Sequence, residues 1–218
     1  MVASSSLLRQ DYSLADFLYT LHLLHHHQHL GRYKLAQELR MSDVQTRIIL
    51  QKLVGANLIE KSSQRRGHQL SSKGREFWLK NQHSLRIPTQ RIFLGRIYTI
   101  GNKDAVVCVK GTGVKQLNTV LLRDESLLNG ALGCTVFLKV QSDQFFLLDA
   151  VYPPLPQIAL TDRKVKRKLT AITQNIPWQE TIIIVGTADY VIDAQIGAIS
   201  AALILVPDEI KRPLRNVV

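Results

Sequence analysis

One segment, residues 31–79, constrains the fold of this chain more than any other part. Apolar residues at helical spacing predict two short helices, over 33–39 and about 43–56, with a turn between them. A strand, a basic loop and a second strand follow within 58–70, and a further helix completes the segment. Together with an amphipathic helix over 13–28 in front of it, this order predicts a winged helix-turn-helix.

The second helix of the pair is the element that such folds commonly place in the major groove of DNA. Its predicted inward stripe is Thr46, Ile49, Leu50 and Leu53. The outward side would then carry Ser42, which is also a good N-cap, with Gln45, Arg47 and Gln51. Gln45 could read adenine edges, and Arg47 could reach guanine or a phosphate. A plain solvated helix face is the alternative interpretation.

The loop between the two predicted strands is basic and contains Gly67, which suits a turn. We expect this wing to contact phosphates or the minor groove through Lys61, Arg65, Arg66 and His68. A solvated basic loop is the alternative. The helix and the wing occur together, which favours DNA contact.

Charge and length bound the remaining possibilities. A formal net charge of +11 on 218 residues suggests a polyanionic partner. Cys108 and Cys134 each lie in an apolar run, which favours buried thiols over a disulfide framework. The apolar stretch 191–206 is shorter than a membrane span and carries Asp193 and Gln195. We therefore expect a cytoplasmic protein with no membrane partner.

Four histidines of the first helix, His22, His25, His26 and His29, fall at helical spacing on one predicted face. Neutral imidazoles one turn apart can share a zinc ion. No cysteine lies nearby, and Asp16 is the one neighbouring carboxylate. We expect a polar stripe beside the leucine face; a metal site or a pH-sensitive interface are the alternatives, and no cofactor is predicted.

Residues 83–90, with Pro88, read as a linker between a DNA-binding domain over 1–82 and a second domain over 91–218. Strands are expected over 92–100 and 105–109, with a turn at Gly101-Asn102. An amphipathic helix over 116–129 should turn Leu117, Leu121 and Leu128 inward.

The rest of the second domain alternates in the same way. We expect a hairpin of 135–140 with 145–150, a basic helix over 161–174, a strand over 181–185, a turn over 186–189 and a helix over about 190–202. This mixture predicts an α+β or α/β chain whose second domain is an α/β sandwich. The basic run could extend a DNA footprint, or be a solvated helix face; it consists of Arg163, Lys164, Lys166, Arg167 and Lys168.

Several strings resemble an archaeal winged-helix family of transcription regulators whose C-terminal half is a domain of unknown function. They are VQTRIILQKLVGANLI, RRGHQLSSKG, AVVCVKG, LLRDESLLNGALGCTVF and GTADYVIDAQIGAISAAL, and together they span most of the chain. The winged-helix strings are generic; the pattern of Arg123, Asp124, Gly130, Ala131, Gly133 and Thr135 is more specific. The resemblance implies a transcription regulator and carries over no ligand.

A small-molecule site in the second domain is one interpretation of its glycine turns and of the adjacent Arg123 and Asp124. The candidate residues are Gly111, Thr112, Arg123, Asp124, Thr135, Gly186 and Asp189. The alternative is structural, with tight glycine turns and local hydrogen bonds.

Together these features predict a dimeric, DNA-binding transcription regulator whose second domain senses a small molecule or mediates oligomerisation. The expected partners are double-stranded DNA, a second copy and a small-molecule effector. One alternative is an enzyme with a regulatory winged helix, such as a riboflavin kinase, although the chain has no phosphate-binding Gly-x₄-Gly-Lys loop and no evident catalytic residues. The other is a winged-helix protein-interaction module.

Overall fold

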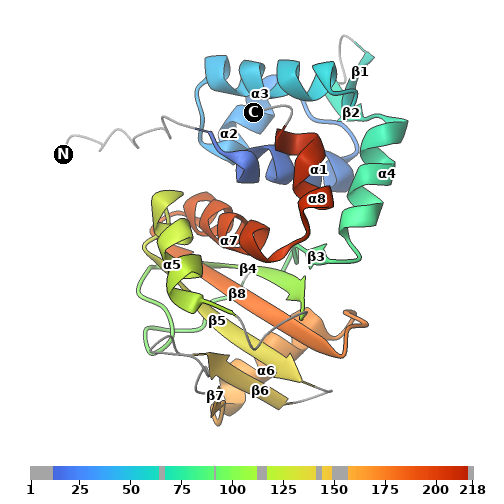
Figure 1. Cartoon of the computed structure of the whole chain (residues 1–218). Coiled ribbons are helices and arrows are strands. Elements are labelled where there is room, and N and C mark those ends of the chain that lie inside the picture. Colours follow the sequence, from blue (N-terminus) through green and yellow to red (C-terminus); the bar gives the residue numbers. More distant parts are fainter. Residues whose placement is uncertain are drawn as a thin grey trace, which may run out of the picture. The chain divides into compact units, whose positions relative to one another are not determined.

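The computed structural model describes residues 12–63, 67–90, 92–111, 117–140, 144–148 and 157–215. The chain divides into two compact units, Met1–Leu79 with Glu209–Val218 and Lys80–Asp208. The sequence predicts a second domain over 91–218, whereas the described residues from Glu209 to Arg215 group with unit 1. Helices and antiparallel sheets make up the described parts, so the chain belongs to the α+β class (Figure 1).

Unit 1 consists of helices followed by a small hairpin and a further helix. In chain order the elements are α1 (Leu14–His27), α2 (Arg32–Leu39), α3 (Asp43–Gly55), β1 (Ile59–Ser63), β2 (Gly67–Leu70), α4 (Ser72–Asn81) and, from the chain's end, α8 (Asp208–Arg215). The helices predicted over 13–28, 33–39 and 43–56 are thus confirmed to within a residue or so at each end.

The turn between α2 and α3 forms where the sequence predicts it. Arg40 ends α2 with a left-handed φ of 50°, and its backbone N–H donates to the carbonyls of the last helical turn. Ser42 then caps α3, accepting a hydrogen bond from the backbone N–H of Gln45 at 3.2 Å. The predicted inward stripe of α3 is confirmed, because its buried residues are Thr46, Ile49, Leu50 and Leu53.

Two glycines let unit 1 bring backbone segments together. Gly67 begins β2 with φ +85°, and a Cβ there would lie 2.3 Å from the carbonyl oxygen of Leu30. A Cβ on Gly74 of α4 would lie 1.8 Å from the carbonyl oxygen of Leu58. Only glycine permits either approach. The hairpin β1–β2 is therefore held against the α1–α2 connection, through the paired backbones of Leu30 and His68.

Unit 2 is built on a six-stranded sheet in the order β3-β4-β8-β5-β6-β7, antiparallel at every described pairing. Its elements are β3 (Leu85–Arg86), β4 (Lys103–Lys110), α5 (Thr119–Leu128), β5 (Gly133–Val140), β6 (Gln144–Leu148), β7 (Gln157–Ala159), α6 (Arg163–Thr173), β8 (Glu180–Ala188) and α7 (Val191–Leu205). The predicted hairpin of 135–140 with 145–150 is β5–β6.

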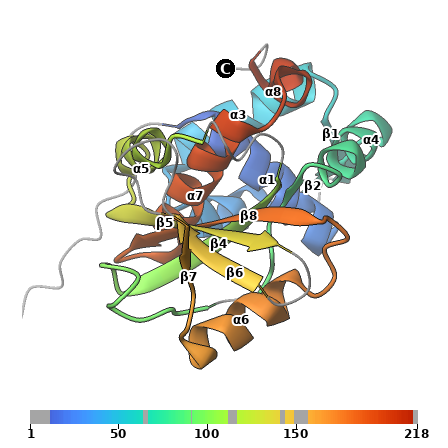
Figure 2. The same ribbon diagram turned by 60° about the horizontal axis from the view of Figure 1, so that its bottom comes forward.

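Helices cover both faces of this sheet (Figure 2). On one face, Val165 and Leu169 of α6 pack with Phe137, Ile183 and Val185 in a single buried cluster. On the other face lie α5 and α7. The central strands β4 and β8 are therefore buried on both sides, which explains why their sequences are nearly continuous apolar runs rather than alternating ones.

Three expectations for unit 2 are wrong. Residues 92–100 do not form a strand, because the chain there folds around the buried carboxylate of Asp104, which accepts from the Leu94 N–H at 2.7 Å and the Thr99 hydroxyl at 3.2 Å. Gly186 is not in a turn; it lies within β8, where a Cβ would meet the Ala194 carbonyl oxygen of α7 at 2.2 Å. The expected linker contains the strand β3.

The helix α5 also differs from its prediction in orientation. Leu117, just before the helix, is buried as expected. Leu121 and Leu128 face outward instead of inward and are 49% and 82% exposed. The inward positions are taken by Leu122 and by two short polar residues, Thr119 and Ser126. Apolar residues occur on so much of this helix that their spacing alone did not identify the buried face.

Among the described helices, none has the length and apolar character needed to cross a membrane.

Candidate nucleic-acid interface

The outward face of α3 is a row of exposed side chains at helical spacing. Arg47 and Gln51, both predicted to lie there, are exposed, and Val44 and Val54 lie on the same face at 54% and 39% exposure. Their positions in the chain differ by three, four and three residues, so they share one side of the helix. Arginine and glutamine one turn apart can bind phosphates and base edges.

Ser42 and Gln45, also predicted to face outward, hold the start of the helix together. Gln45 Oε1 accepts hydrogen bonds from the backbone N–H of Ser42 at 3.1 Å and from its hydroxyl at 2.9 Å. This reciprocal arrangement is a capping box. Bidentate pairing of the Gln45 amide with N6 and N7 of an adenine would require it to leave this cap, whereas Arg47 and Gln51 are exposed.

An ion pair joins the beginnings of α2 and α3. Arg32 Nε lies 2.6 Å from Asp43 Oδ1. The pair is partly exposed, so its contribution to stability is small. It has an electrostatic consequence, because it offsets the one carboxylate in the first turn of α3. An unneutralised carboxylate at that helix end would repel an approaching phosphate.

The hairpin β1–β2 contributes Lys61, which is exposed, and His68, which is half-buried. Burial lowers the pKa of His68, and the nearby Lys61 and Arg32 lower it further. Both effects favour the neutral imidazole of His68 over the cation that would attract a phosphate. Its backbone instead pairs with Leu30, with N···O distances of 3.0 and 2.9 Å. The remaining two predicted wing residues, Arg65 and Arg66, lie outside the described residues.

The histidine stripe is divided by the structure. His22 is buried against the rings of Tyr19, His26 and Trp78, with centroid separations of 5.6, 4.5 and 5.5 Å. Burial, and secondarily the charge of His26, lowers the pKa of His22 to about 3. Because α1 ends at His27 and Gln28 has φ 61°, His29 does not continue the helical face. Nowhere in the described ranges do three or more His, Cys, Asp or Glu side chains meet in a way that could hold a metal ion.

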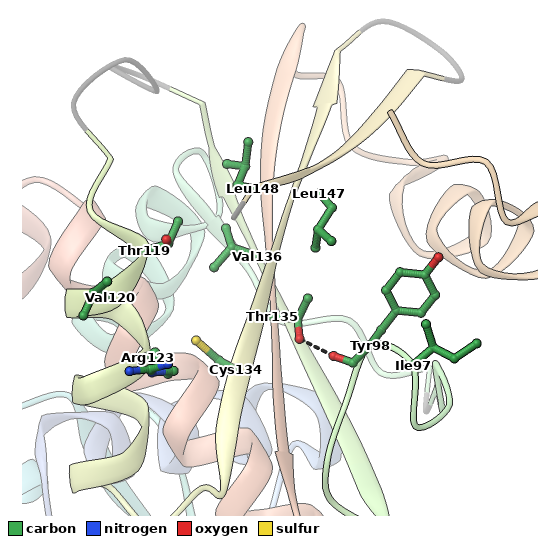
Figure 3. A pocket seen from close by; sticks show the side chains of 10 residues that line it. All are labelled: Ile97, Tyr98, Thr119, Val120, Arg123, Cys134, Thr135, Val136, Leu147 and Leu148. Atoms are coloured by element: carbon green, nitrogen blue, oxygen red, sulfur yellow. Dashed lines mark hydrogen bonds between the residues drawn. The ribbon is translucent and has the colours of Figure 1, made fainter. Parts of the chain in front are cut away.

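In unit 2 a cleft of about 270 Å³ is lined by two of the predicted ligand residues, Arg123 and Thr135, which lie on opposite sides of the strand β5 (Figure 3). The sequence analysis missed its other lining residues: Ile97, Tyr98, Thr119, Val120, Cys134, Val136, Leu147 and Leu148. Thr135 donates its hydroxyl hydrogen to the carbonyl of Tyr98. One guanidinium beside an aliphatic wall could hold a small organic anion. Tyr98 reaches the cleft only through the fold around Asp104, a tertiary arrangement without a local sequence signal.

The remaining predicted ligand residues are not brought to this cleft. Gly111 hydrogen-bonds through its N–H to the Glu180 carbonyl at 2.9 Å, and Asp189 accepts from the Asn102 amide at 2.9 Å. Gly186 is covered by α7, and Asp124 is exposed beside Arg123, 3.8 Å from its Nε. Thr112 lies outside the described residues. Gly111 and Gly186 therefore make close contacts within unit 2, and Gly186 lies in a strand and not in a turn.

The two cysteines are separate thiols, Cys108 buried and Cys134 half-buried. Burial raises the pKa of each thiol to about 12, although Arg123 opposes this at Cys134. Neither is a thiolate at neutral pH, and the thiolate is the nucleophilic form. Cys134 thus lines the cleft as a small apolar group.

The basic helix α6 has a buried apolar face and a charged outer one. Arg163, Lys164 and Arg167 are exposed, while Val165 and Leu169 are buried against the sheet. Lys168 Nζ donates to the carbonyl of Phe93. This is the solvated helix face that the sequence analysis gave as one alternative, and its cations can still attract an anion.

No protein-family profile matches the sequence, and no characterised protein matches it significantly. One solved structure, of a hypothetical protein from Pyrococcus horikoshii OT3, is similar to the chain with a TM-score of 0.70. The two are 22% identical, and the match covers 95% of this chain and all of the other. At that identity the likeness concerns the fold alone.

Proposed function

We propose that this chain is a DNA-binding transcription regulator, in which unit 1 is a winged helix-turn-helix and unit 2 an α/β sandwich serving dimerisation or ligand sensing. The observation that carries the proposal is the outward face of α3, where Arg47 and Gln51 stand exposed on a helix capped by Ser42. The α2–turn–α3 pair followed by the hairpin β1–β2 is the arrangement that binds DNA in winged-helix proteins.

In this proposal α3 enters the major groove. Arg47 pairs with a guanine or a phosphate, and Gln51 reads a neighbouring base edge. Lys61 of the hairpin contacts the phosphate backbone, which adds affinity without adding sequence information. The net charge of +11 favours association with a polyanion and makes the affinity depend on salt.

A second copy of the chain supplies the second half-site. Helix-turn-helix dimers bind half-sites about one helical turn of DNA apart, and this doubles the contacts available to one small basic domain. A small anion held in the Arg123 cleft of unit 2 would act as the effector in this proposal.

A protein-interaction module is the second candidate function, and one observation favours it. Val44 and Val54 are exposed on the same face of α3 as Arg47, at 54% and 39%. Aliphatic side chains can touch thymine methyl groups in the major groove, but they would serve equally well in a contact with a protein.

The test is selection of binding sites from a pool of randomised duplex DNA by the full chain at moderate salt. Enrichment of a two-fold symmetric motif, with half-sites about 10 base pairs apart, is the expected result. Retention of the pool without enrichment of any sequence would reduce the proposal to nonspecific binding. No retention even at low salt would remove DNA as the partner and leave the protein-interaction module.

A further inference from the structure

The outward face of α5 is made of aliphatic side chains. Leu128 is 82% exposed, Leu121 49%, Leu127 43% and Val120 39%. An amphipathic helix in a monomeric protein turns such residues toward its own core and leaves polar ones outside. Here Thr119 and Ser126 occupy buried positions while three leucines face outward.

One further leucine follows the helix. Leu132, four residues after Leu128, is 43% exposed. We call this set the α5 face; it consists of Val120, Leu121, Leu127, Leu128 and Leu132. An exposed set of aliphatic side chains of this kind marks an interaction site.

The exposed charges of α5, which lie beside the aliphatic residues of the α5 face, identify the partner of this face. Arg123 and Asp124 are adjacent, and their side chains are 58% and 53% exposed with Nε 3.8 Å from Oδ1. The third charged residue of α5, Glu125, is half-buried and accepts a hydrogen bond from the Asn129 amide at 3.0 Å. The exposed pair, one positive and one negative charge, does not select an anionic or a cationic partner. The pair does complement the same pair in a second copy of the chain, because a two-fold axis puts the two helices in opposite directions and so brings unlike charges together.

We propose that the α5 face is the dimer interface, with α5 packed antiparallel against α5 of a second copy. The middle of α5, which runs from Thr119 to Leu128, falls between Arg123 and Asp124. A two-fold axis at that point places Arg123 opposite the partner's Asp124, and Asp124 opposite the partner's Arg123. The same axis places Val120 opposite the partner's Leu127. The interface is therefore isologous, with an aliphatic core and two reciprocal ion pairs.

This inference rests on the dimeric state in the proposed function but not on DNA binding. It is tested by the mass of the full chain in the absence of DNA, so that its failure and the failure of DNA recognition are separate results. Sedimentation velocity from about 1 to about 100 µM protein should show a concentration-dependent dimer.

Leu128→Asp places a carboxylate at each end of the proposed interface, among the exposed leucines, and should weaken dimerisation at least about 10-fold. Leu79→Asp is the matched control. Leu79 is also an outward leucine of a helix, 54% exposed in α4, and lies away from the α5 face in the chain. Both sites are exposed, so the far-ultraviolet circular dichroism of both variants should match that of the parent chain.

The reciprocal charges allow a sharper test. Arg123→Asp leaves only negative charges at the axis and Asp124→Arg only positive ones, and each should weaken the homodimer about 10-fold. The double variant Arg123→Asp/Asp124→Arg restores opposite charges across the axis and should recover the dimer. An equimolar mixture of the two single variants should form heterodimers.

Three results would overturn the proposal. One is a monomer at every concentration. Another is a dimer that Leu128→Asp weakens no more than Leu79→Asp does. The last is a charge-reversed double variant that dimerises no better than either single variant, since this would show that Arg123 and Asp124 do not face each other across the axis.

Discussion

Helices α3 and α5 are built alike and differ in what they turn outward. Each begins with a side-chain cap, Ser42 for α3 and Asn118 for α5, and each buries a stripe of its own unit's core. The outward row of α3 combines Arg47 and Gln51 with two valines, whereas that of α5 is mainly leucine. The inward faces explain the fold, and the outward faces carry the functional information.

The difference is the basis for proposing two kinds of partner. A phosphate backbone is hydrated and charged, so it is met by long polar side chains that keep hydrogen-bonding capacity. A protein interface excludes water at its centre and is depleted in lysine and glutamate. On these grounds we propose DNA as the partner of the outward face of α3 and a second copy of the chain as the partner of the α5 face.

The largest effect is expected from a change beneath α5. A Cβ on Gly197 of α7 would lie 2.5 Å from Ala131 Cβ and 2.7 Å from Ser126 Oγ, where α5 meets α7. Gly197→Val should destabilise unit 2 by about 3 kcal/mol. Gly55→Val, at the end of α3 with nothing within 4 Å of its Cβ, is the matched control and should be nearly neutral.

Denaturant unfolding followed by tryptophan fluorescence measures this difference by unit, because Trp78 lies in unit 1 and Trp178 in unit 2. Trp78→Phe and Trp178→Phe backgrounds isolate the two signals. Equal losses from Gly197→Val and Gly55→Val would show that α5 is not closely packed on α7.

The second effect is a contrast in pH dependence between the units. The folded-state pKa of His22, about 3, lies below its ordinary value of 6.5, so the unfolded state binds the proton more tightly. The neutral, buried His22 therefore contributes fully to the stability of unit 1 above pH 6.5. This contribution is lost as the pH falls toward 3, and the free energy of unfolding should decrease by about 2 kcal/mol between pH 7 and 5. His22→Phe, which keeps a ring against Trp78, should remove this slope.

In unit 2, Asp104 has the opposite effect on the pH dependence of stability. Burial raises the pKa of Asp104 above its ordinary 3.8, although the Leu94 N–H and two hydroxyls oppose the shift. Its contribution is fully present below pH 3.8 and declines as the pH rises through the folded-state pKa. Unfolding of the two tryptophan variants from pH 4 to pH 7 measures both slopes. A slope for unit 1 that survives in His22→Phe would assign the effect to another group.

The third effect concerns the outward face of α3. Arg47→Ala should weaken binding to a selected duplex about 10-fold, since one charged contact to a base edge or phosphate is lost. Arg163→Ala removes the same charge from an exposed position of α6 and should change the affinity little. Fluorescence anisotropy across a salt series measures both. Equal losses for the two variants would attribute binding to net charge alone.

The smallest effects are expected at the helix caps. Ser42 takes part in a reciprocal box with Gln45, whereas the Asn118 side chain accepts one bond, from the Leu121 N–H at 3.1 Å. Ser42→Ala should cost about 1 kcal/mol and Asn118→Ala about half as much. The same two-signal unfolding experiment compares them. A larger loss for Asn118→Ala would reverse the order of the two caps.

Local sequence patterns were sufficient to predict an element where the apolar residues followed one clear helical or strand spacing. The stripe of α3, the cap at Ser42 and the hairpin β5–β6 were all predicted correctly from spacing and turn residues. Local signals failed at residues 92–100, because an apolar, strand-like run is folded around Asp104 by contacts that spacing does not encode. They also failed at Gly186, since a glycine that resembles a turn is there to admit α7.

At the candidate sites too, some residues could be placed from local spacing and others only from tertiary structure. Arg47 and Gln51 could be placed on an outward face because the buried stripe beside them was clear. The orientation of Leu121 and Leu128 could not be predicted, because leucine on an amphipathic helix is expected to be buried, whereas these two residues are 49% and 82% exposed. Arg123 and Thr135 were identified, but Tyr98 and Thr119 reach the same cleft only through tertiary structure.

Hydroxyl-radical footprinting of the full chain tests the central claim most directly, because it measures both outward faces in one sample. Raising the protein from about 1 to about 100 µM without DNA should protect Leu127 and Leu128 and leave Val44 and Val54 reactive. Adding a selected duplex at low protein concentration should protect Val44 and Val54. Protection of α3 by protein concentration alone, or no protection of α5 under either condition, would contradict the assignment of these two faces to two different partners.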